Sequence, residues 1–158
     1  MSGQSIWVRA AQEGDRRSLA LLFAAVAEER DGIAAEPPID VDKQAAAFDL
    51  ERTLVALASD DLVGLIFVIE SGFGFGEIGM MVAEPWRGHG VGTALVAAAI
   101  EWARGHALHK LTLSVFPQNT AAIALYRKFG FVEEGRHPKH IRRASGELWD
   151  LIDMGLPL

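Results

Sequence analysis

The chain contains no cysteine, and this absence excludes several kinds of chemistry at once. Without a thiol there is no disulfide, no thiolate nucleophile and no zinc site built on cysteine ligands. The sequence also has no apolar run of the ~18 residues that a membrane-spanning helix requires, and residues 1–10 have no signal-peptide core. We therefore expect a cytoplasmic protein with no membrane partner.

Positive charge is scarce as well, because 15 Lys and Arg residues stand against 21 Asp and Glu residues, for a net charge of −6. A general nucleic-acid-binding protein needs a basic surface to neutralise phosphates, so we expect no nucleic-acid partner. The charge is uneven, with an acid-rich segment over residues 28–51 and a basic segment over residues 127–143. Two solvated faces of opposite sign would explain this pattern. The functional alternative is a polyanion site near the second half and a cation-attracting mouth near the first.

Half of the 158 residues are apolar and 23% are charged, which is the composition of a globular protein. We expect one domain over residues 1–158, burying roughly 70% of the unfolded chain's surface. Periodicity and turn residues predict strands over residues 6–9, 54–58, 63–70, 77–83, 111–116, 131–134 and 147–156, and helices over residues 15–30, 42–48, 90–104 and 119–129. Asp15 is the expected N-cap of the first helix. Consecutive strands that lead into alternating strands and helices indicate an α/β fold, a mixed sheet with helices on its faces.

The most informative motif is the glycine-rich stretch "RGHGVG" over residues 87–92, directly before the third predicted helix. A helix N-terminus presents unpaired backbone N–H groups and about half a positive charge. Glycines let the backbone approach an anion closely, and Arg87 adds a forked cationic donor. A sharp strand-to-helix turn would account for one glycine but not for three beside an arginine. The stretch therefore predicts a pyrophosphate site.

Two common phosphate-binding motifs do not fit this stretch. A dinucleotide-binding fold requires a third glycine where Thr93 or Leu95 stands, and an acidic residue after the strand over residues 111–116. Neither requirement is met. A P-loop requires Gly-Lys-Ser/Thr, which is absent from the sequence.

Three segments together resemble a known family. They are the loop over residues 87–92, "NTAAIALYRKFGF" over residues 119–131, and "GELWDLIDMGL" over residues 146–156. The chain resembles the GNAT superfamily of acetyl-CoA-dependent N-acetyltransferases, and the likeness is strongest from residue 77 onward. The resemblance implies a mixed, mostly antiparallel sheet of about seven strands flanked by about four helices. It also implies acetyl-CoA as co-substrate.

The same resemblance implies which residues bind the cofactor. They are the backbone of the strand before the loop, the loop itself with the first turn of its helix, and one face of the next helix: Met80, Met81, Val82, Arg87, Gly88, His89, Gly90, Val91, Gly92, Thr93, Asn119, Ala122 and Tyr126. In the family this strand splays away from its neighbour, so that its N–H groups can stabilise an oxyanion. Asn119 would hold the pantetheine arm or the adenine end of the cofactor.

Tyr126 is the candidate general acid. It is the chain's one tyrosine, and it shares a helical face with Asn119 and Ala122 at spacings i, i+3 and i+7. Beside the thioester sulfur, its phenol would protonate the departing thiolate, as a tyrosine does in family members. The alternative is a core ring whose hydroxyl finds a surface partner.

Glu77 is the candidate general base. An aliphatic ammonium with a pKa near 10 is only about one part in a thousand neutral at pH 7. A group must therefore take its proton, and Glu77 begins the strand that leads to the loop, placed to act directly or through a water. The alternative is an ordinary carboxylate at a strand edge.

The acceptor is the least determined part of the prediction. Enzymes that acetylate protein N-termini often carry a glutamate where Ser114 stands, so a small amine or amino-acid-like acceptor is favoured. The acid-rich segment would favour a cationic amine. Acetylation of protein N-termini or lysines, and a non-catalytic acyl-CoA-binding sensor, remain alternatives, and a homodimer stays open. His137 and His140 have no expected carboxylate partner, so we expect no metal site.

Overall fold

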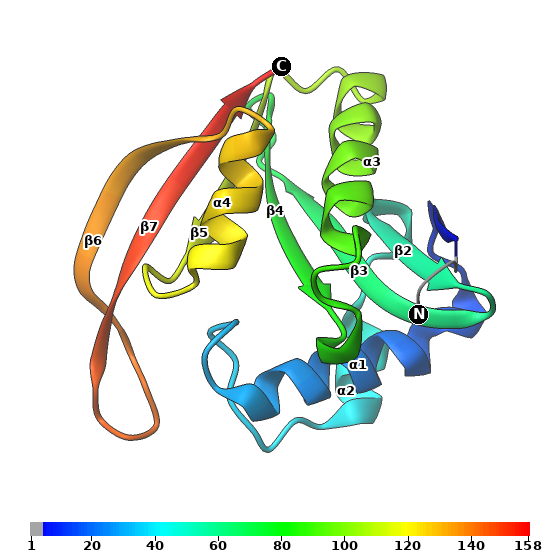
Figure 1. The fold of residues 1–158 in the computed structure, drawn as a ribbon, viewed down its shortest axis with the longest axis horizontal. Helices are drawn as coiled ribbons and strands as arrows, with labels where there is room; N and C mark the ends of the chain where they lie inside the picture. Colours follow the sequence, from blue (N-terminus) through cyan, green and yellow to red (C-terminus); the bar gives the residue numbers. More distant parts are fainter. Residues whose placement is uncertain (1–4) are drawn as a thin grey trace.

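The computed structural model describes residues 5–158, in which seven strands form one sheet (Figure 1). The strands are β1 (Ile6–Ala10), β2 (Thr53–Ala58), β3 (Asp61–Glu70), β4 (Phe75–Val82), β5 (Lys110–Val115), β6 (Val132–Arg142) and β7 (Leu148–Pro157), in the spatial order β1-β2-β3-β4-β5-β7-β6. The helices are α1 (Arg16–Glu29), α2 (Val41–Ala47), α3 (Val91–Gly105) and α4 (Thr120–Lys128). The expected mixed, mostly antiparallel sheet of seven strands with four helices is confirmed.

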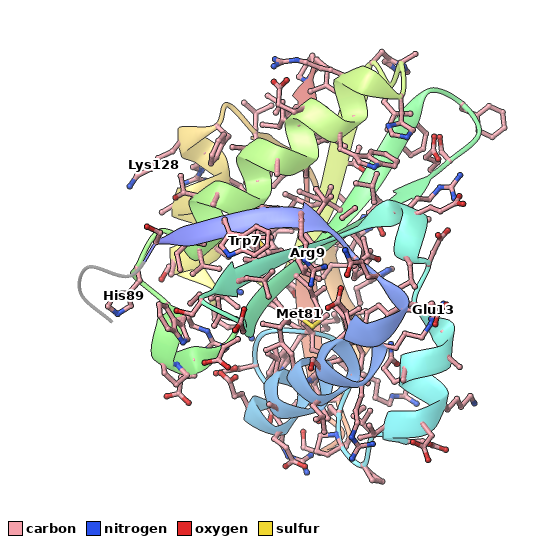
Figure 2. The ribbon with its side chains drawn as sticks, turned by 90° about the vertical axis from the view of Figure 1, so that its right-hand side faces the viewer. Trp7, Arg9, Glu13, Met81, His89 and Lys128 are labelled. Carbon is pink, nitrogen blue, oxygen red and sulfur yellow. The ribbon has the colours of Figure 1, made fainter. Side chains whose placement is uncertain are left out.

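The sheet separates two hydrophobic cores, because the central strands bury apolar side chains on both faces. On one face, Ile66 and Leu111 pack with the apolar side of α3, including Leu95. On the other face, Leu65 packs against α1 through Leu19. Figure 2 shows the two helix layers on opposite sides of the sheet, with the labelled Met81 between β4 and α1.

The single parallel pairing of the sheet creates its opening. β4 and β5 are parallel and pair at three positions only, from Phe75 with Lys110 to Glu77 with Thr112. Beyond Glu77 the two strands diverge, and Figure 1 shows the β1–β4 half and the β5–β7–β6 half spreading apart toward α1. The remaining edge of β4 therefore has no ladder partner from β5. This divergence positions the candidate site.

Two details of the prediction are wrong. The strand predicted over residues 131–134 continues to Arg142, because β6 pairs along most of β7 and has few buried positions whose alternation would reveal it. A register shift between His137 and Ile141 further obscures its period. Asp15 makes no side-chain cap of α1; its carboxylate accepts hydrogen bonds from Arg9 and from the Gln12 backbone.

Candidate active site

A cavity of about 820 Å³ occupies the opening between β4 and β5. Its walls come from six parts of the chain: α1 with the loop after it, β3 and β4, the loop before α3 with its first turn, β5, α4, and the β6–β7 pair. Most residues predicted to form the site line this one cavity: Glu77, Met80, Met81, Val82, Arg87, Gly88, Gly90, Gly92, Thr93, Asn119, Ala122 and Tyr126. Segments far apart in the sequence thus meet where the sequence analysis expects chemistry.

Two predicted residues do not line the cavity. Val91 buries its side chain in the core beneath α3, where it is 1% exposed. His89 is exposed and lies edge-on to Trp86, with 6.1 Å between the ring centroids. Figure 2 shows the His89 ring at the margin of the molecule. Any contact of Val91 with a ligand would therefore involve its backbone.

The three glycines of the loop serve two different purposes. Gly88 and Gly90 have φ angles of 77° and 86°, the left-handed conformation that side chains rarely adopt, and an added Cβ would meet no atom within 4 Å. Gly90 is the N-cap of α3, so this conformation directs the backbone into the helix. A Cβ on Gly92, by contrast, would lie 2.8 Å from a methyl of Leu125 in α4. Gly92 therefore allows close packing of Leu125 against α3, a role which the sequence interpretation missed.

Arg87 has a partner that the sequence analysis did not predict. Its two terminal nitrogens donate to the carboxylate oxygens of Glu29 at 2.6 and 2.8 Å, and its Nε donates to the Val82 carbonyl at 3.1 Å. The hydrogen bonds to Glu29 raise the pKa of the guanidinium. The pair joins the end of α1 to the glycine-rich loop. An anion that binds Arg87 must therefore share it with Glu29 or displace Glu29.

Tyr126 is buried at the inner wall of the cavity. Its side chain is part of the core, the residue is 7% exposed, and its ring lies edge-on to Phe131 at 5.6 Å. Burial raises the pKa of the Tyr126 phenol to about 12. The hydroxyl consequently keeps its proton at neutral pH, which is the state that a general acid needs.

Asn119 forms the N-cap of α4 and so fixes the helix that carries Tyr126. Its side-chain oxygen accepts a hydrogen bond from the Ala122 backbone at 3.3 Å. A cap of this kind is worth about 1 kcal/mol of helix stability. Only the amide nitrogen of Asn119 then remains as a donor for a ligand.

Glu77 stands at the point where β4 and β5 separate. It pairs across the sheet with Ile69 on one side and Thr112 on the other, and its side chain is exposed to the cavity. Alternation along β4 places Glu77, Gly79 and Met81 on the face that carries α1. A carboxylate here can reach a molecule that enters from the α1 side.

A second polar group on the same face is built from three strands. The Ser114 hydroxyl donates to Asp153 at 2.8 Å, and Nε2 of His137 lies 2.7 Å from the other Asp153 oxygen. Burial raises the pKa of the Asp153 carboxyl, but the hydrogen bonds with His137 and Ser114 outweigh burial and hold it below its usual value. The expectation that His137 has no carboxylate partner is therefore wrong. Within residues 5–158 no three His, Cys, Asp or Glu side chains are placed to hold a metal ion.

The loop after α1 is held in place by Arg143, which the sequence analysis treated only as part of a basic segment. Arg143 is 4% exposed and donates to the Ala34 and Arg30 carbonyls at 2.9 and 3.0 Å. Its guanidinium also lies over the rings of Trp149 and Phe116, at 4.4 and 5.2 Å from their centroids. A long-range contact of this kind has no local sequence pattern. Arg143 thereby fixes one wall of the cavity.

We expect Arg143→Met to lower the free energy of unfolding by about 3 kcal/mol, because it removes charge-assisted hydrogen bonds and one of the two arginines, Arg30 and Arg143, that pair with Glu36. Urea denaturation measures the change. Arg142→Met is the matched control, since Arg142 is exposed, and it should alter stability by less than about 0.5 kcal/mol. Equal effects of the two substitutions would contradict the role given to Arg143.

The comparison with known proteins agrees with this geometry. A family model described as the acetyltransferase (GNAT) family matches residues 19–131. This chain belongs to the GNAT acetyltransferase family. The resemblance inferred from the three sequence segments is thereby confirmed. No helix among residues 5–158 has both the length and the apolar character that a membrane crossing demands.

Individual GNAT relatives differ in how much of the chain they match. An L-methionine sulfoximine/L-methionine sulfone acetyltransferase of Pseudomonas aeruginosa is 31% identical over 134 residues, 78% of this chain and 77% of that protein. The uncharacterized N-acetyltransferase YobR of Bacillus subtilis is 37% identical over 81 residues, 51% of this chain but only 32% of YobR. A crystal structure of a ribosomal-protein-alanine N-acetyltransferase from Brucella melitensis has a TM-score of 0.88 at 28% identity, with 96% of this chain and 99% of that chain covered.

Proposed function

We propose that this GNAT protein transfers an acetyl group from acetyl-CoA to the primary amine of a small molecule. One observation carries the proposal: a buried, protonated phenol at Tyr126 and a carboxylate at Glu77 line the same cavity, where the sheet opens. A proton donor and a proton acceptor in one cavity are what direct aminolysis of a thioester requires.

The residues present fit acetyl-CoA. The left-handed backbone at Gly88 and Gly90, with Arg87 and the N-terminus of α3, suits a pyrophosphate. The free edge of β4 beyond Glu77 suits the pantetheine amides, and Asn119 lines the same cavity. Bound acetyl-CoA supplies an activated acyl carbon and a thiolate leaving group.

The chain's own groups then move the protons. Glu77, directly or through a water, accepts a proton from the ammonium, so that the free amine attacks the carbonyl carbon and forms a tetrahedral intermediate. The nitrogen of that intermediate then loses its second proton to solvent, which leaves the neutral amide. Backbone N–H groups of Met80 and Val82, which point away from β3, stabilise the oxyanion. As the carbon–sulfur bond breaks, Tyr126 donates its proton to the thiolate and is later reprotonated from solvent.

A base role for Glu77 predicts a specific pH dependence. Glu77→Gln should lower kcat/KM by roughly 10²-fold near pH 7 and by much less near pH 10, where the amine has already lost its proton. Steady-state rates across this range measure the effect. Glu101→Gln, on the exposed side of α3, is the control and should leave the profile unchanged. An equal loss at every pH would assign Glu77 a structural role instead.

The acceptor assignment has support from two directions. The Pseudomonas aeruginosa relative is named for small amino-acid-like acceptors, whereas the Brucella melitensis structure is named for a protein acceptor. Ser114 occupies the position where a glutamate would favour a peptide, and here it is hydrogen-bonded to Asp153. A small acceptor is therefore favoured. Parallel assays with small amines and with a peptide whose N-terminal residue is alanine decide between a small acceptor and a protein acceptor.

A further inference from the structure

The half of the cavity that faces α1 is lined mainly by apolar side chains. We call it the acceptor chamber; the side chains that define it are those of Phe23, Ile33, Phe67, Ile69, Ile141 and Leu151. The tip of the Phe67 ring packs over Gly79, where an added Cβ would collide with it, so this wall requires a glycine at residue 79. Such walls suit an apolar molecular body.

The polar groups of the acceptor chamber have one electrostatic sign. Glu77 opens directly into it, and the Ser114 hydroxyl lines it with the Asp153 carboxylate behind. Because Ser114 donates its hydrogen to Asp153, its oxygen is left to accept a hydrogen bond from a ligand. Both groups can receive N–H donors from an ammonium. Neither can bind an anion.

Cations that could bind a carboxylate are already engaged elsewhere. Across residues 5–158, Arg87 is the one Lys or Arg that lines the cavity, and both its terminal nitrogens are bound by Glu29. Arg143 lies behind the wall, with its terminal nitrogens on the Ala34 and Arg30 carbonyls. A carboxylate in the acceptor chamber would therefore face Glu77 without a compensating charge.

We infer that the acceptor is a primary amine with an apolar or aromatic body and no carboxylate, rather than an α-amino acid. This inference rests on the proposed function and narrows its acceptor.

Matched acceptor pairs test the inference, with acetyl-CoA-dependent thiol release as the readout. The pairs are 2-phenylethylamine with phenylalanine and 3-(methylthio)propylamine with methionine, which differ only by the carboxylate. We expect kcat/KM to favour each amine by roughly 10²-fold or more, since an unpaired charge in a low-polarity pocket is strongly rejected. The α-amino group of an amino acid loses its proton more readily than an alkylamine does, so basicity alone would give the opposite order.

A gain-of-function variant provides the complementary test. Ala35 lines the cavity from the loop after α1, and Ala35→Arg would supply a cation, whereas Ala35→Gln adds similar length without charge. We expect Ala35→Arg, but not Ala35→Gln, to narrow the preference for amine over amino acid by roughly 10-fold or more.

The outcomes separate this inference from the proposed function. Faster turnover of methionine or phenylalanine than of the matched amine overturns the inference about the acceptor. The proposed N-acetyltransferase function would still stand. A preference that Ala35→Gln narrows as much as Ala35→Arg also overturns it. If no amine, amino acid or peptide releases thiol, the proposed function fails, and the inference fails with it.

Discussion

Tyr126→Phe is expected to lower kcat by roughly 10²–10⁴-fold while the affinity for acetyl-CoA stays nearly constant. The substitution keeps the buried ring and its edge-on contact with Phe131, and it removes only the hydroxyl. Without the phenol proton, the thiolate must leave unprotonated, so the loss should fall on the chemical step. Single-turnover kinetics measure this step, and calorimetry measures acetyl-CoA binding.

The pH profile supplies a control for the role of Tyr126. Burial raises the pKa of its phenol from 10.0 to about 12, so the acid form persists well above the ordinary range. The wild-type single-turnover rate should therefore not decline up to pH 10. Two results would contradict the assignment. One is a fall in the wild-type rate that is centred at or below pH 10 and is absent from Tyr126→Phe. The other is an unchanged single-turnover rate in Tyr126→Phe.

Gly90→Val is expected to abolish measurable binding of acetyl-CoA. Gly90 has a φ of 86° and caps α3, so a β-branched residue would be strained there and would move the loop that must hold the pyrophosphate. Its methyl groups would also project from the loop, where an added Cβ meets no protein atom within 4 Å. Calorimetry with acetyl-CoA measures the loss.

Gly72→Val separates strain from binding. Gly72, on the turn between β3 and β4, has a φ of 82° and no atom within 4 Å of an added Cβ, but it does not line the cavity. Both variants should lose about 1–2 kcal/mol of stability, and only Gly90→Val should lose acetyl-CoA affinity. Wild-type affinity in a folded Gly90→Val protein would rule out a pyrophosphate site at this loop.

Contiguous features of the site could be predicted from the sequence. The loop over residues 87–92 precedes a helix, and Asn119, Ala122 and Tyr126 share one helical face, so local spacing alone places them. The apolar and alternating runs likewise predicted the location of every strand among residues 5–158, because the central strands are rich in buried apolar residues. Only β6 was strongly underestimated, since it lies at the sheet edge with few buried positions.

Long-range contacts could not be predicted in the same way. Arg87 and Glu29 are 58 residues apart, and Arg143 bonds to carbonyls more than 100 residues away. Carbonyl acceptors and aromatic partners carry no local sequence pattern. The roles of Gly88 and Gly92 also look alike in sequence, although one permits a left-handed backbone and the other permits helix packing. The packing role of Gly92 therefore could not be separated in the sequence from the backbone role of Gly88.

The central claim is that this GNAT protein catalyses acetyl transfer to an amine with Tyr126 as its acid. The most direct measurement follows free thiol and N-acetylated product together, for wild type and Tyr126→Phe, with acetyl-CoA and 2-phenylethylamine, 3-(methylthio)propylamine and an alanine-ended peptide as acceptors. The account predicts equal amounts of thiol and acetylated amine from wild type, and a rate lower by roughly 10²-fold or more from Tyr126→Phe. Tight binding of acetyl-CoA without product from any acceptor would contradict it and identify a non-catalytic acyl-CoA-binding protein.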